Sequence, residues 1–320
     1  MLGKAIQRDD TAAAKKKKKR KAFHTWPLHL MLIPGALVVF VYSYIPMFGL
    51  VMAFQDFDIF LGLEAFWKSD WVGFQNFVDL WNMGEPLKVI GNTVTISLLK
   101  LVCGFGVPIV VAILLNEVRK SWFKRGVQTI IYMPHFLSWV LLAGIIQQLL
   151  APDGTVNQAL GNLLGIDSIP FLTSNSLFVP MLVITDIWKN FGFGTIIYMA
   201  SITGIDPALY EAAQIDGASR WKQTLHVTLP GMRPIIVLQL ILSLQNVLNA
   251  GFDQIFNLYN VQVYETADII DTWVYRMSFQ STTPMYDMST AIGLFKSVVS
   301  LIFIASSYWL AHKFADYEIF

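Results

Sequence analysis

The sequence of 320 residues is 55% hydrophobic, 14% aromatic and only 14% charged, with a formal net charge of +1. A single soluble core cannot bury that much apolar surface, so this composition excludes an ordinary soluble globular protein and predicts a bilayer protein. The single cysteine, Cys103, excludes an intrachain disulfide and gives no sign of a metal cluster.

The first predicted region is an N-terminal tail at residues 1–27, which contains the basic run KKKKKRK at residues 15–21. A hydrophobic stretch begins within about ten residues of this run, so we interpret it as a cytoplasmic tail beside anionic membrane lipid. We prefer this to the alternative, a nucleic-acid-binding segment, and expect no nucleic-acid partner. The apolar stretch is much longer than the roughly 7–15 residues of a signal peptide core, so we expect it to remain as a membrane span.

Apolar runs long enough to cross a bilayer recur along the rest of the chain. A span requires about 20 helical residues. Runs near that length lie at residues 28–54, 90–115, 127–150, 177–202, 235–252 and 288–311. We therefore expect an all-α, polytopic integral membrane protein with about six transmembrane helices. Its membrane domain would cover residues 28–312, with a C-terminal tail at 313–320.

Basic residues predict the orientation of these spans. Beyond the N-terminal tail they gather in the second and fourth connections and in the last tail, at Arg119, Lys120, Lys124, Arg125, Arg220, Lys222, Arg233 and Lys313. The opposite side carries Lys68, Lys88 and Arg276. The positive-inside rule therefore places both termini and residues 203–232 in the cytoplasm. The acidic outer segments contain Trp67, Trp71, Trp81 and Trp273, which fit either a membrane boundary or a docking surface.

Polar side chains within the spans are candidates for a substrate path. On the fifth predicted span they recur at spacings of three or four, at Gln239, Ser243, Asn246, Asn249 and Asp253. Further candidates are Trp188, Lys189 and Asn190 on the fourth span and Lys296 on the sixth, and Lys100 belongs to a similar stripe on the second. Polar groups in hydrocarbon must meet water or each other, so these faces line a cavity or form interhelical hydrogen bonds.

Lys189 has two interpretations. It follows Asp186 by three residues, so the two side chains could form an ion pair on one helix. Alternatively, Lys189 faces the path and meets an acidic or hydroxyl-rich substrate, while Trp188 offers a flat face to a sugar ring. Asp186 and Asp253 are the acidic partners expected within the spans, so at least one of Lys100, Lys189 and Lys296 should lack a carboxylate.

A polar segment at residues 206–230, DPALYEAAQIDGASRWKQTLHVTLP, lies between two apolar runs. Asp206 is a suitable helix N-cap, and Pro207 suits the first helical position because its missing N–H would have no partner there. Gly217 relaxes the backbone, so a second short helix is expected to leave at a new angle until Pro230 stops it. The segment therefore predicts an exposed helical elbow within a loop at residues 203–232.

These residues resemble the signature of the membrane-spanning permease subunits of ATP-binding-cassette importers. Glu211, Ala212, Ala213 and Gly217 match its first part, and Leu229 and Pro230 match its end, with Val227 in place of isoleucine. The runs YIPMFGLVMAFQDF, WVGFQNF and YMPHFLSWV, at residues 44–57, 71–77 and 132–140, look like the branch that serves complex oligosaccharides, alginate-type sugars among them. The resemblance covers the chain from about residue 28 to its end.

The resemblance implies a type I importer permease that forms the membrane path for an oligosaccharide, including acidic ones such as alginate fragments. It implies a second permease subunit that is a different chain, a dimer of separate ATPase subunits that hold ATP and Mg, and an extracytoplasmic solute-binding protein. This chain would bind no cofactor itself and would lie in a bacterial inner membrane. The implied ATPase-coupling residues are Asp206, Pro207, Tyr210, Glu211, Ala212, Ala213, Asp216, Gly217, Arg220 and Trp221.

Catalytic motifs are absent from the sequence. No G-x-x-x-x-G-K-[ST] phosphate loop, H-E-x-x-H motif or nucleophile elbow occurs, and the histidines are scattered. We therefore expect no catalytic residue, no metal site and no enzyme activity. The alternatives are an ion-coupled secondary transporter, with Asp186 and Asp253 as its titrating groups, and a membrane scaffold. The segment at residues 206–230 argues against both.

Overall fold

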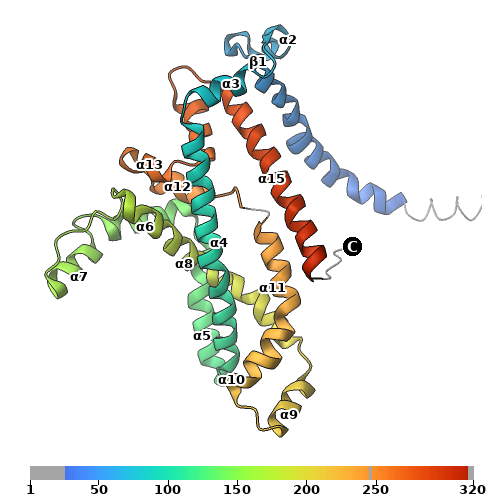
Figure 1. Ribbon diagram of the computed structural model, residues 1–320, viewed down its shortest axis with the longest axis vertical. Helices are drawn as coiled ribbons and strands as arrows, with labels where there is room; N and C mark the ends of the chain where they lie inside the picture. The colour runs from blue at the N-terminus through green and yellow to red at the C-terminus, as the bar shows by residue number, and fades with distance from the viewer. Residues whose placement is uncertain (1–25, 245–246, 316–320) are drawn as a thin grey trace, which may run out of the picture.

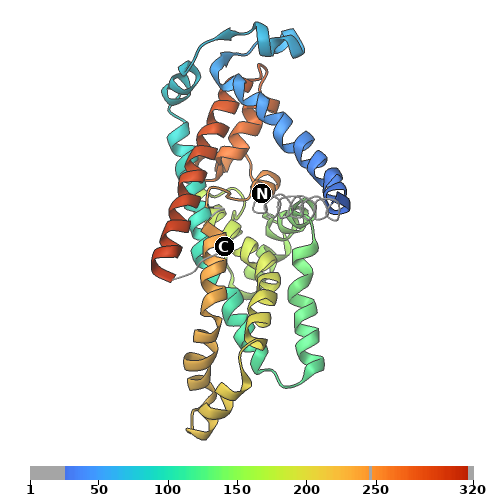
Figure 2. The ribbon, with the colours of Figure 1, turned by 90° about the vertical axis from the view of Figure 1, so that its right-hand side faces the viewer.

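The computed structural model describes residues 26–244 and 247–315, and nearly all regular structure in these ranges is helical. The first span is helical at residues 26–39 and continues through the π turn η1 (Phe40–Tyr44) and the 3-10 segment η2 (Ile45–Phe54). Side chains at residues 26–48 are all exposed, whereas η2 packs against the last helix of the chain. Figures 1 and 2 show this span leaving the rest of the bundle at an angle.

A small cap follows the first span at one end of the molecule (Figure 1). In it, β1 (Gln55–Asp56) pairs antiparallel with β2 (Asp70–Trp71), and η3 (Ile59–Glu64) and α2 (Ala65–Lys68) lie between the two strands in sequence. α3 (Gln75–Asn82) completes the cap. The Nδ2 of Asn76 donates to the carbonyl oxygens of Ala53 and Gln55, at 3.1 and 2.8 Å, so a buried amide holds α3 to the end of the first span.

Two long helices form the centre of the bundle. α4 (Pro86–Glu117) and α8 (Asn175–Thr203) occupy the regions predicted as the second and fourth spans. They approach closely at small residues, since a Cβ added at Gly194 would lie 3.2 Å from the ring of Pro108. Ile96 of α4 and Phe178 of α8 are fully buried in one hydrophobic cluster, which ties the outer halves of the two helices together.

The region predicted as a third span, residues 127–150, is not one helix. The chain forms α5 (Ser121–Tyr132), the 3-10 turn η4 (Met133–Phe136) and, after an extended Leu137, α6 (Trp139–Leu150) and α7 (Thr155–Leu164). Pro134 lacks an N–H, and Ser138 starts a new helix by accepting a hydrogen bond from the N–H of Leu141 at 3.3 Å. These two residues account for the break.

The region after α8 also differs from the prediction. α9 (Pro207–Ile215) forms the elbow, and α10 (Arg220–Gln223), the π turn η5 (Thr224–Thr228) and α11 (Leu229–Leu244) follow it as one continuous helix. Pro230 therefore does not stop the helix. The N–H of Leu229 bonds to the carbonyl of Thr224, and the wider π turn accommodates the proline ring that follows it. α11 is described as far as Leu244, and residues 247–251 are not helical, so the helix does not reach the predicted boundary at residue 252.

Short helices fill the stretch between α11 and the last span. They are α12 (Phe252–Leu258), η6 (Val261–Val263), α13 (Tyr264–Ala267), α14 (Ile270–Tyr275) and η7 (Arg276–Gln280). The Nδ2 of Asn92 on α4 donates to the carbonyl oxygens of Glu265 and Asp268, both at 3.1 Å, which holds α13 against α4. α15 (Tyr286–Ala315) is the last span and agrees with the prediction for residues 288–311.

The described residues contain five helices that are long and apolar enough to cross a membrane: Trp26–Phe54, Pro86–Glu117, Trp139–Leu164, Arg220–Leu244 and Tyr286–Ser306. α8 has 29 residues and a central position in the bundle, but it carries polar and charged groups at its middle. The prediction of an all-helical, polytopic membrane protein is therefore confirmed. The cap and the elbow lie at opposite ends of the molecule (Figure 1).

Candidate coupling surface and membrane cavity

The elbow has well-defined helix ends. The carboxylate of Asp206 accepts a hydrogen bond from the N–H of Ala208 at 2.9 Å, and Pro207 is the first helical residue, as predicted. At the other end Gly217 has φ +72°, a left-handed conformation. The N–H of Ala218 reaches the carbonyl of Ala213 at 2.8 Å, and that of Gly217 reaches Gln214 at 3.0 Å. This pair of bonds is a Schellman motif, so Gly217 sets the bend.

The elbow is fixed to the membrane helices. The hydroxyls of Tyr210 and Thr228 lie 3.0 Å apart, and Arg220 forms an ion pair with Glu117 at the end of α4, at 3.7 Å. A Cβ added at Gly231 would lie 2.7 Å from the side chain of Ile205, so α11 packs directly on the chain that enters the elbow. The elbow is therefore held to α4 and α11.

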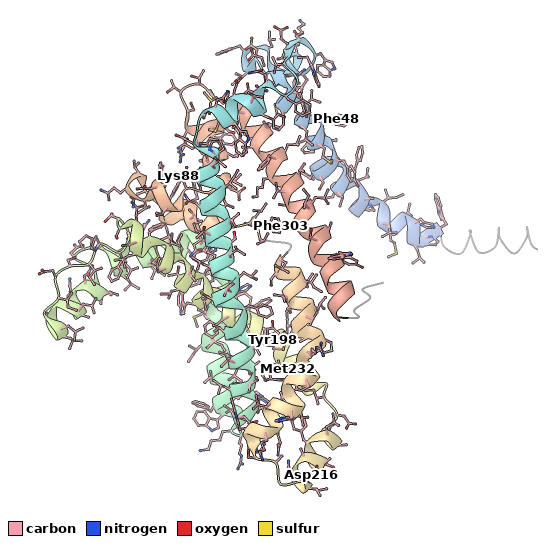
Figure 3. All side chains as sticks on the ribbon, viewed as in Figure 1. Phe48, Lys88, Tyr198, Asp216, Met232 and Phe303 are labelled. Atoms are coloured by element: carbon pink, nitrogen blue, oxygen red, sulfur yellow. The ribbon has the colours of Figure 1, made fainter. Side chains whose placement is uncertain are left out.

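The outer face of the elbow is free to meet a partner. α9 has no buried residue, and the expected coupling residues Glu211, Ala212, Asp216 and Gly217 are exposed, whereas Ala213 is half-buried. Ile215 is 86% exposed and Trp221 is 69% exposed, which is unusual for large apolar groups outside a membrane. Figure 3 shows Asp216 at the tip of the molecule, away from every span. These features fit a docking surface.

A cavity of about 230 Å³ lies among α4, α8 and α11. It brings together three of the predicted path residues, Asn190, Gln239 and Ser243. Its other polar walls are Lys100 and Asp186, and Phe105, Phe191 and Tyr198 contribute aromatic surface. The cavity therefore presents amide, hydroxyl and aromatic groups.

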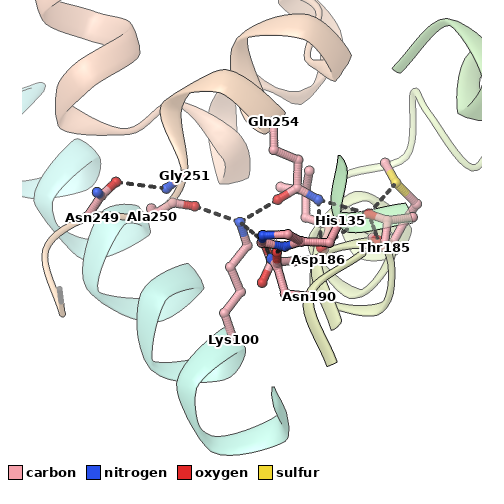
Figure 4. A network of polar contacts seen from close by, with 11 residues as sticks. Lys100, His135, Thr185, Asp186, Asn190, Asn249, Ala250, Gly251 and Gln254 are labelled. Carbon is pink, nitrogen blue, oxygen red and sulfur yellow. Dashed lines mark hydrogen bonds and ion pairs between the residues drawn. The ribbon is translucent and has the colours of Figure 1, made fainter. Parts of the chain in front are cut away.

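Lys100 is the centre of a polar network beside this cavity (Figure 4). Its ammonium donates to the carbonyl of Ala250 at 2.7 Å and to the side chain of Gln254, and it lies 3.8 Å from a carboxylate oxygen of Asp186. Asn190 donates to the same carboxylate at 3.3 Å. The sequence pattern predicts that Lys100 lies on a polar stripe, but the path candidates do not include it. Its partners are distant in the sequence, so its position beside the cavity could not be predicted.

Lys189 does not form its predicted ion pair, and its place on the substrate path stays a prediction. Asp186 pairs with Lys100, so the expected ion pair on α8 does not form. Lys189 is 7% exposed, lies outside the cavity and donates to backbone carbonyl groups of η4 and Leu137. The neighbouring Trp188 is 45% exposed and does not line the cavity either.

The remaining path candidates are dispersed. Lys296 forms an ion pair with Asp271 of α14 at 2.5 Å, a carboxylate that lies outside the predicted spans. Because α11 ends at Leu244, Asn249 and Asp253 do not share a helical face with Gln239. Asn249 instead accepts from the N–H of Gly251 at 3.3 Å, and Asp253 begins α12. Asn246 lies outside the described residues.

The helical bundle, its exposed elbow and its polar cavity define a membrane transport subunit. Residues 104–316 match the model of the family described as "binding-protein-dependent transport system inner membrane component". The chain belongs to this family, so it is the multi-pass inner membrane permease subunit of an ATP-binding-cassette importer and is not itself an enzyme. This membership decides against the secondary-transporter and scaffold alternatives.

Individual relatives extend over nearly the whole chain. Protein LplB of Bacillus subtilis (strain 168) is 42% identical over 92% of this chain and 91% of its own length. The polygalacturonan/rhamnogalacturonan transport system permease protein YteP of the same organism is 41% identical, over 92% of this chain and 90% of its own. A chain of a bacterial ABC transporter involved in the import of the acidic polysaccharide alginate superposes with TM-score 0.83 at 39% identity, over 91% of this chain and 96% of that chain.

Proposed function

We propose that this permease forms part of the membrane path for oligosaccharides derived from acidic polysaccharides, alginate fragments included. The substrate class is supported by two relatives at about 40% identity that are described as serving polygalacturonan or rhamnogalacturonan and alginate. The polar and aromatic cavity among α4, α8 and α11 is compatible with a sugar. Lys100 and Asp186 compensate each other's charge there, so this cavity would recognise hydroxyl groups rather than select for anions.

The observation that carries the transport mechanism is the rigid, exposed elbow. ATP and Mg would be held by a dimer of separate ATPase subunits, whose closure would displace Glu211 and its neighbours. Because α8 leads into Asp206 and α11 packs on Ile205, a displacement of the elbow would move two of the three helices that line the cavity. A rigid link of this kind is what alternation between inward-open and outward-open states requires.

Two further surfaces support the proposed partners. The first span is apolar and exposed at residues 26–48, so in the assembled importer it would be covered by lipid and by a second permease subunit, a different chain. The cap at the opposite end from the elbow would meet the solute-binding protein outside the membrane, and both termini would lie in the cytoplasm. One similar solved structure is that of the bacterial alginate ABC transporter in complex with an alginate pentasaccharide-bound periplasmic protein.

Reconstituted uptake tests this function. The permease would be placed in vesicles with its partner permease and ATPase, and loaded binding protein would be added on the side opposite the ATPase. We expect ATP-dependent uptake of labelled uronic-acid oligosaccharides, and ATP hydrolysis stimulated by the loaded binding protein. Uptake driven by an ion gradient without ATP would contradict the proposal, as would transport of amino acids or metals but not of oligosaccharides.

A further inference from the structure

The third span is broken inside the bundle, and the break exposes backbone acceptors. η4 (Met133–Phe136) is a 3-10 turn, and Leu137 is extended with φ −80° and ψ 139°. Carbonyl groups in such a break lose part of their regular helical bonding, and that of Pro134 accepts from the backbone N–H of Leu137 at 3.2 Å. In an apolar environment each unpaired carbonyl group is costly, so a broken span requires hydrogen-bond donors from elsewhere in the protein.

Lys189 of α8 supplies these donors. Its ammonium donates to the carbonyl oxygen of Pro134 at 3.2 Å, to that of His135 at 2.9 Å and to that of Leu137. An ammonium group has three N–H donors, so all of them are used at the break. The Nζ atom also lies 5.4 Å from the centroid of the Trp139 ring, at the start of α6. Lys189 therefore contacts the residues that connect both halves of the span.

Other side chains on α8 fit the same break. A Cβ added at Gly192 would lie 2.0 Å from the carbonyl oxygen of Ile131, so glycine lets the two backbones touch. The ring of Phe193 stacks on His135 with centroids 4.1 Å apart and planes inclined by 5°. Asn190 and His135 lie 3.2 Å apart. Because Lys189, Gly192 and Phe193 are spaced by three and four residues, they share one face of α8.

We propose that Lys189 is a positioning residue for transport, which holds both halves of the broken third span on α8. α8 leads directly into the elbow, so a displacement of the elbow is transmitted to α8. With Lys189 in place, α5 and α6 follow α8 as one body; without it, the break bends and the movement is lost between them. The role in transport rests on the proposed function, whereas the role at the break rests on the geometry of Lys189 alone.

Hydrogen exchange in the purified complex tests the contact at the break. In Lys189→Met, which keeps the length of the side chain, we expect the amides of residues 137–142 to exchange about tenfold faster, the effect of losing charged hydrogen bonds. Lys189→Arg keeps the charge and the donors and should restore slow exchange in large part. Lys296→Met is the matched control, since it removes another lysine from a span and should leave these amides unchanged.

Uptake by the same variants tests the role in transport. For Lys189→Met we expect the maximal rate to fall about tenfold, with the same loss for an acidic and a neutral oligosaccharide and an unchanged half-saturating concentration. Lys189→Arg should recover most of the rate. Loss confined to the acidic sugar, with a higher half-saturating concentration, would make Lys189 a substrate ligand and overturn the proposal.

Other outcomes are equally decisive. Faster exchange with unchanged uptake would reduce Lys189 to a purely structural residue, and unchanged exchange would remove it from the break. If Lys189→Met fails to assemble, Lys189→Gln, which keeps two N–H donors, should give intermediate exchange and uptake, and wild-type values for both would overturn the proposal. If the wild-type complex transports no oligosaccharide, the proposed function fails, but the exchange comparison still decides whether Lys189 holds the break.

Discussion

Lys100, Lys189 and Lys296 satisfy their charges in three different ways. Lys296 has a carboxylate partner, Asp271, at 2.5 Å. Lys100 combines a more distant carboxylate with the carbonyl of Ala250, which follows the end of α11. Lys189 uses backbone carbonyl groups, and in the described part of the chain it forms no ion pair. Two of the three lysines therefore bind carbonyl groups where a neighbouring helix is interrupted, a position that other transporters give to a bound cation.

Gly192 provides a prediction at the scale of one residue. Its α-carbon meets the backbone of α5, and a methyl group would lie 2.0 Å from the carbonyl oxygen of Ile131. Backbone cannot move aside as a flexible side chain can, so Gly192→Ala should destabilise the complex by about 1–3 kcal/mol. The readout is the temperature at which half of the detergent-purified complex loses its monodisperse elution peak, which should fall by several degrees.

Gly144 of α6 is the matched control for this substitution. A Cβ at Gly144 would meet nothing within 4 Å. Alanine also favours helix over glycine by about 0.5–1 kcal/mol, so Gly144→Ala should equal or slightly exceed the wild type in thermal stability. If the two variants behave alike, the close approach of α8 to α5 does not limit stability.

At the scale of the element, the length of the apolar runs predicted some helices well and others poorly. α4, α8 and α15 begin and end within a few residues of their apolar runs, because uninterrupted apolar sequence of that length fits a bilayer as one helix. The prediction of one helix for the third run was wrong, because Pro134 and Ser138 interrupt a stretch whose hydropathy is continuous. Hydropathy measures burial in lipid and does not register where hydrogen bonds within a helix stop.

The elbow was predictable because its signals are local. Asp206, Pro207 and Gly217 act through their own backbone geometry, and the structure confirms the first two as helix start and the third as the bend. The prediction that Pro230 ends the helix was wrong. A proline inside a helical stretch can be accommodated instead of ending the helix, and here the π turn η5 precedes Pro230. That adjustment depends on the packing of α11 and leaves no trace in the sequence.

Gly217 provides the prediction for this element. Its φ of +72° disfavours a β-branched side chain, although nothing lies within 4 Å of an added Cβ. Strain of about 1–3 kcal/mol in Gly217→Val should therefore distort the bend without a steric clash elsewhere. We expect delivery of substrate by the binding protein to continue, while the stimulation of ATP hydrolysis by loaded binding protein is lost in reconstituted vesicles.

The variant Gly217→Asn separates the effect of backbone strain from the effect of adding a side chain at this position. Asparagine tolerates the left-handed region better than other residues, so this variant should keep most of the stimulation. Full stimulation in the valine variant would show that the bend at Gly217 is not part of the coupling path. Equal loss in both variants would point instead to direct contact between this exposed position and the ATPase.

At the scale of the whole molecule, the path residues depend on contacts that the sequence does not display. Asn190, Gln239 and Ser243 meet at one cavity, but Asn249 and Asp253 leave the predicted face because α11 ends at Leu244. The network around Lys100 joins α4 to α8 and to the residues before α12, and Lys100 is separated by 86 residues from Asp186 and by 150 from Ala250. A helical wheel drawn on one span cannot recover such a site.

The orientation of the molecule in the membrane is the last prediction. Charge asymmetry predicts that the cap faces outward and the elbow faces the cytoplasm, and the two lie at opposite ends of the structure, with Lys88 and Asp216 near either end (Figure 3). Single cysteines at Lys68, Lys88, Lys120 and Lys222 are suitable probes, because all four side chains are exposed. Arg276 is less suitable, since its guanidinium donates to both carboxylate oxygens of Asp268 at 3.1 and 2.6 Å.

Cys103 is exposed and must first be replaced by alanine so that it takes no label. In intact cells, a membrane-impermeant maleimide should then label the cysteines at positions 68 and 88 and leave those at 120 and 222 unlabelled until the membrane is opened. The physical reason is the cost of moving basic loops across the bilayer against the positive-inside preference. Labelling of all four sites from outside, or of positions 120 and 222 alone, would contradict the proposed orientation, and with it the contact between the elbow and a cytoplasmic ATPase.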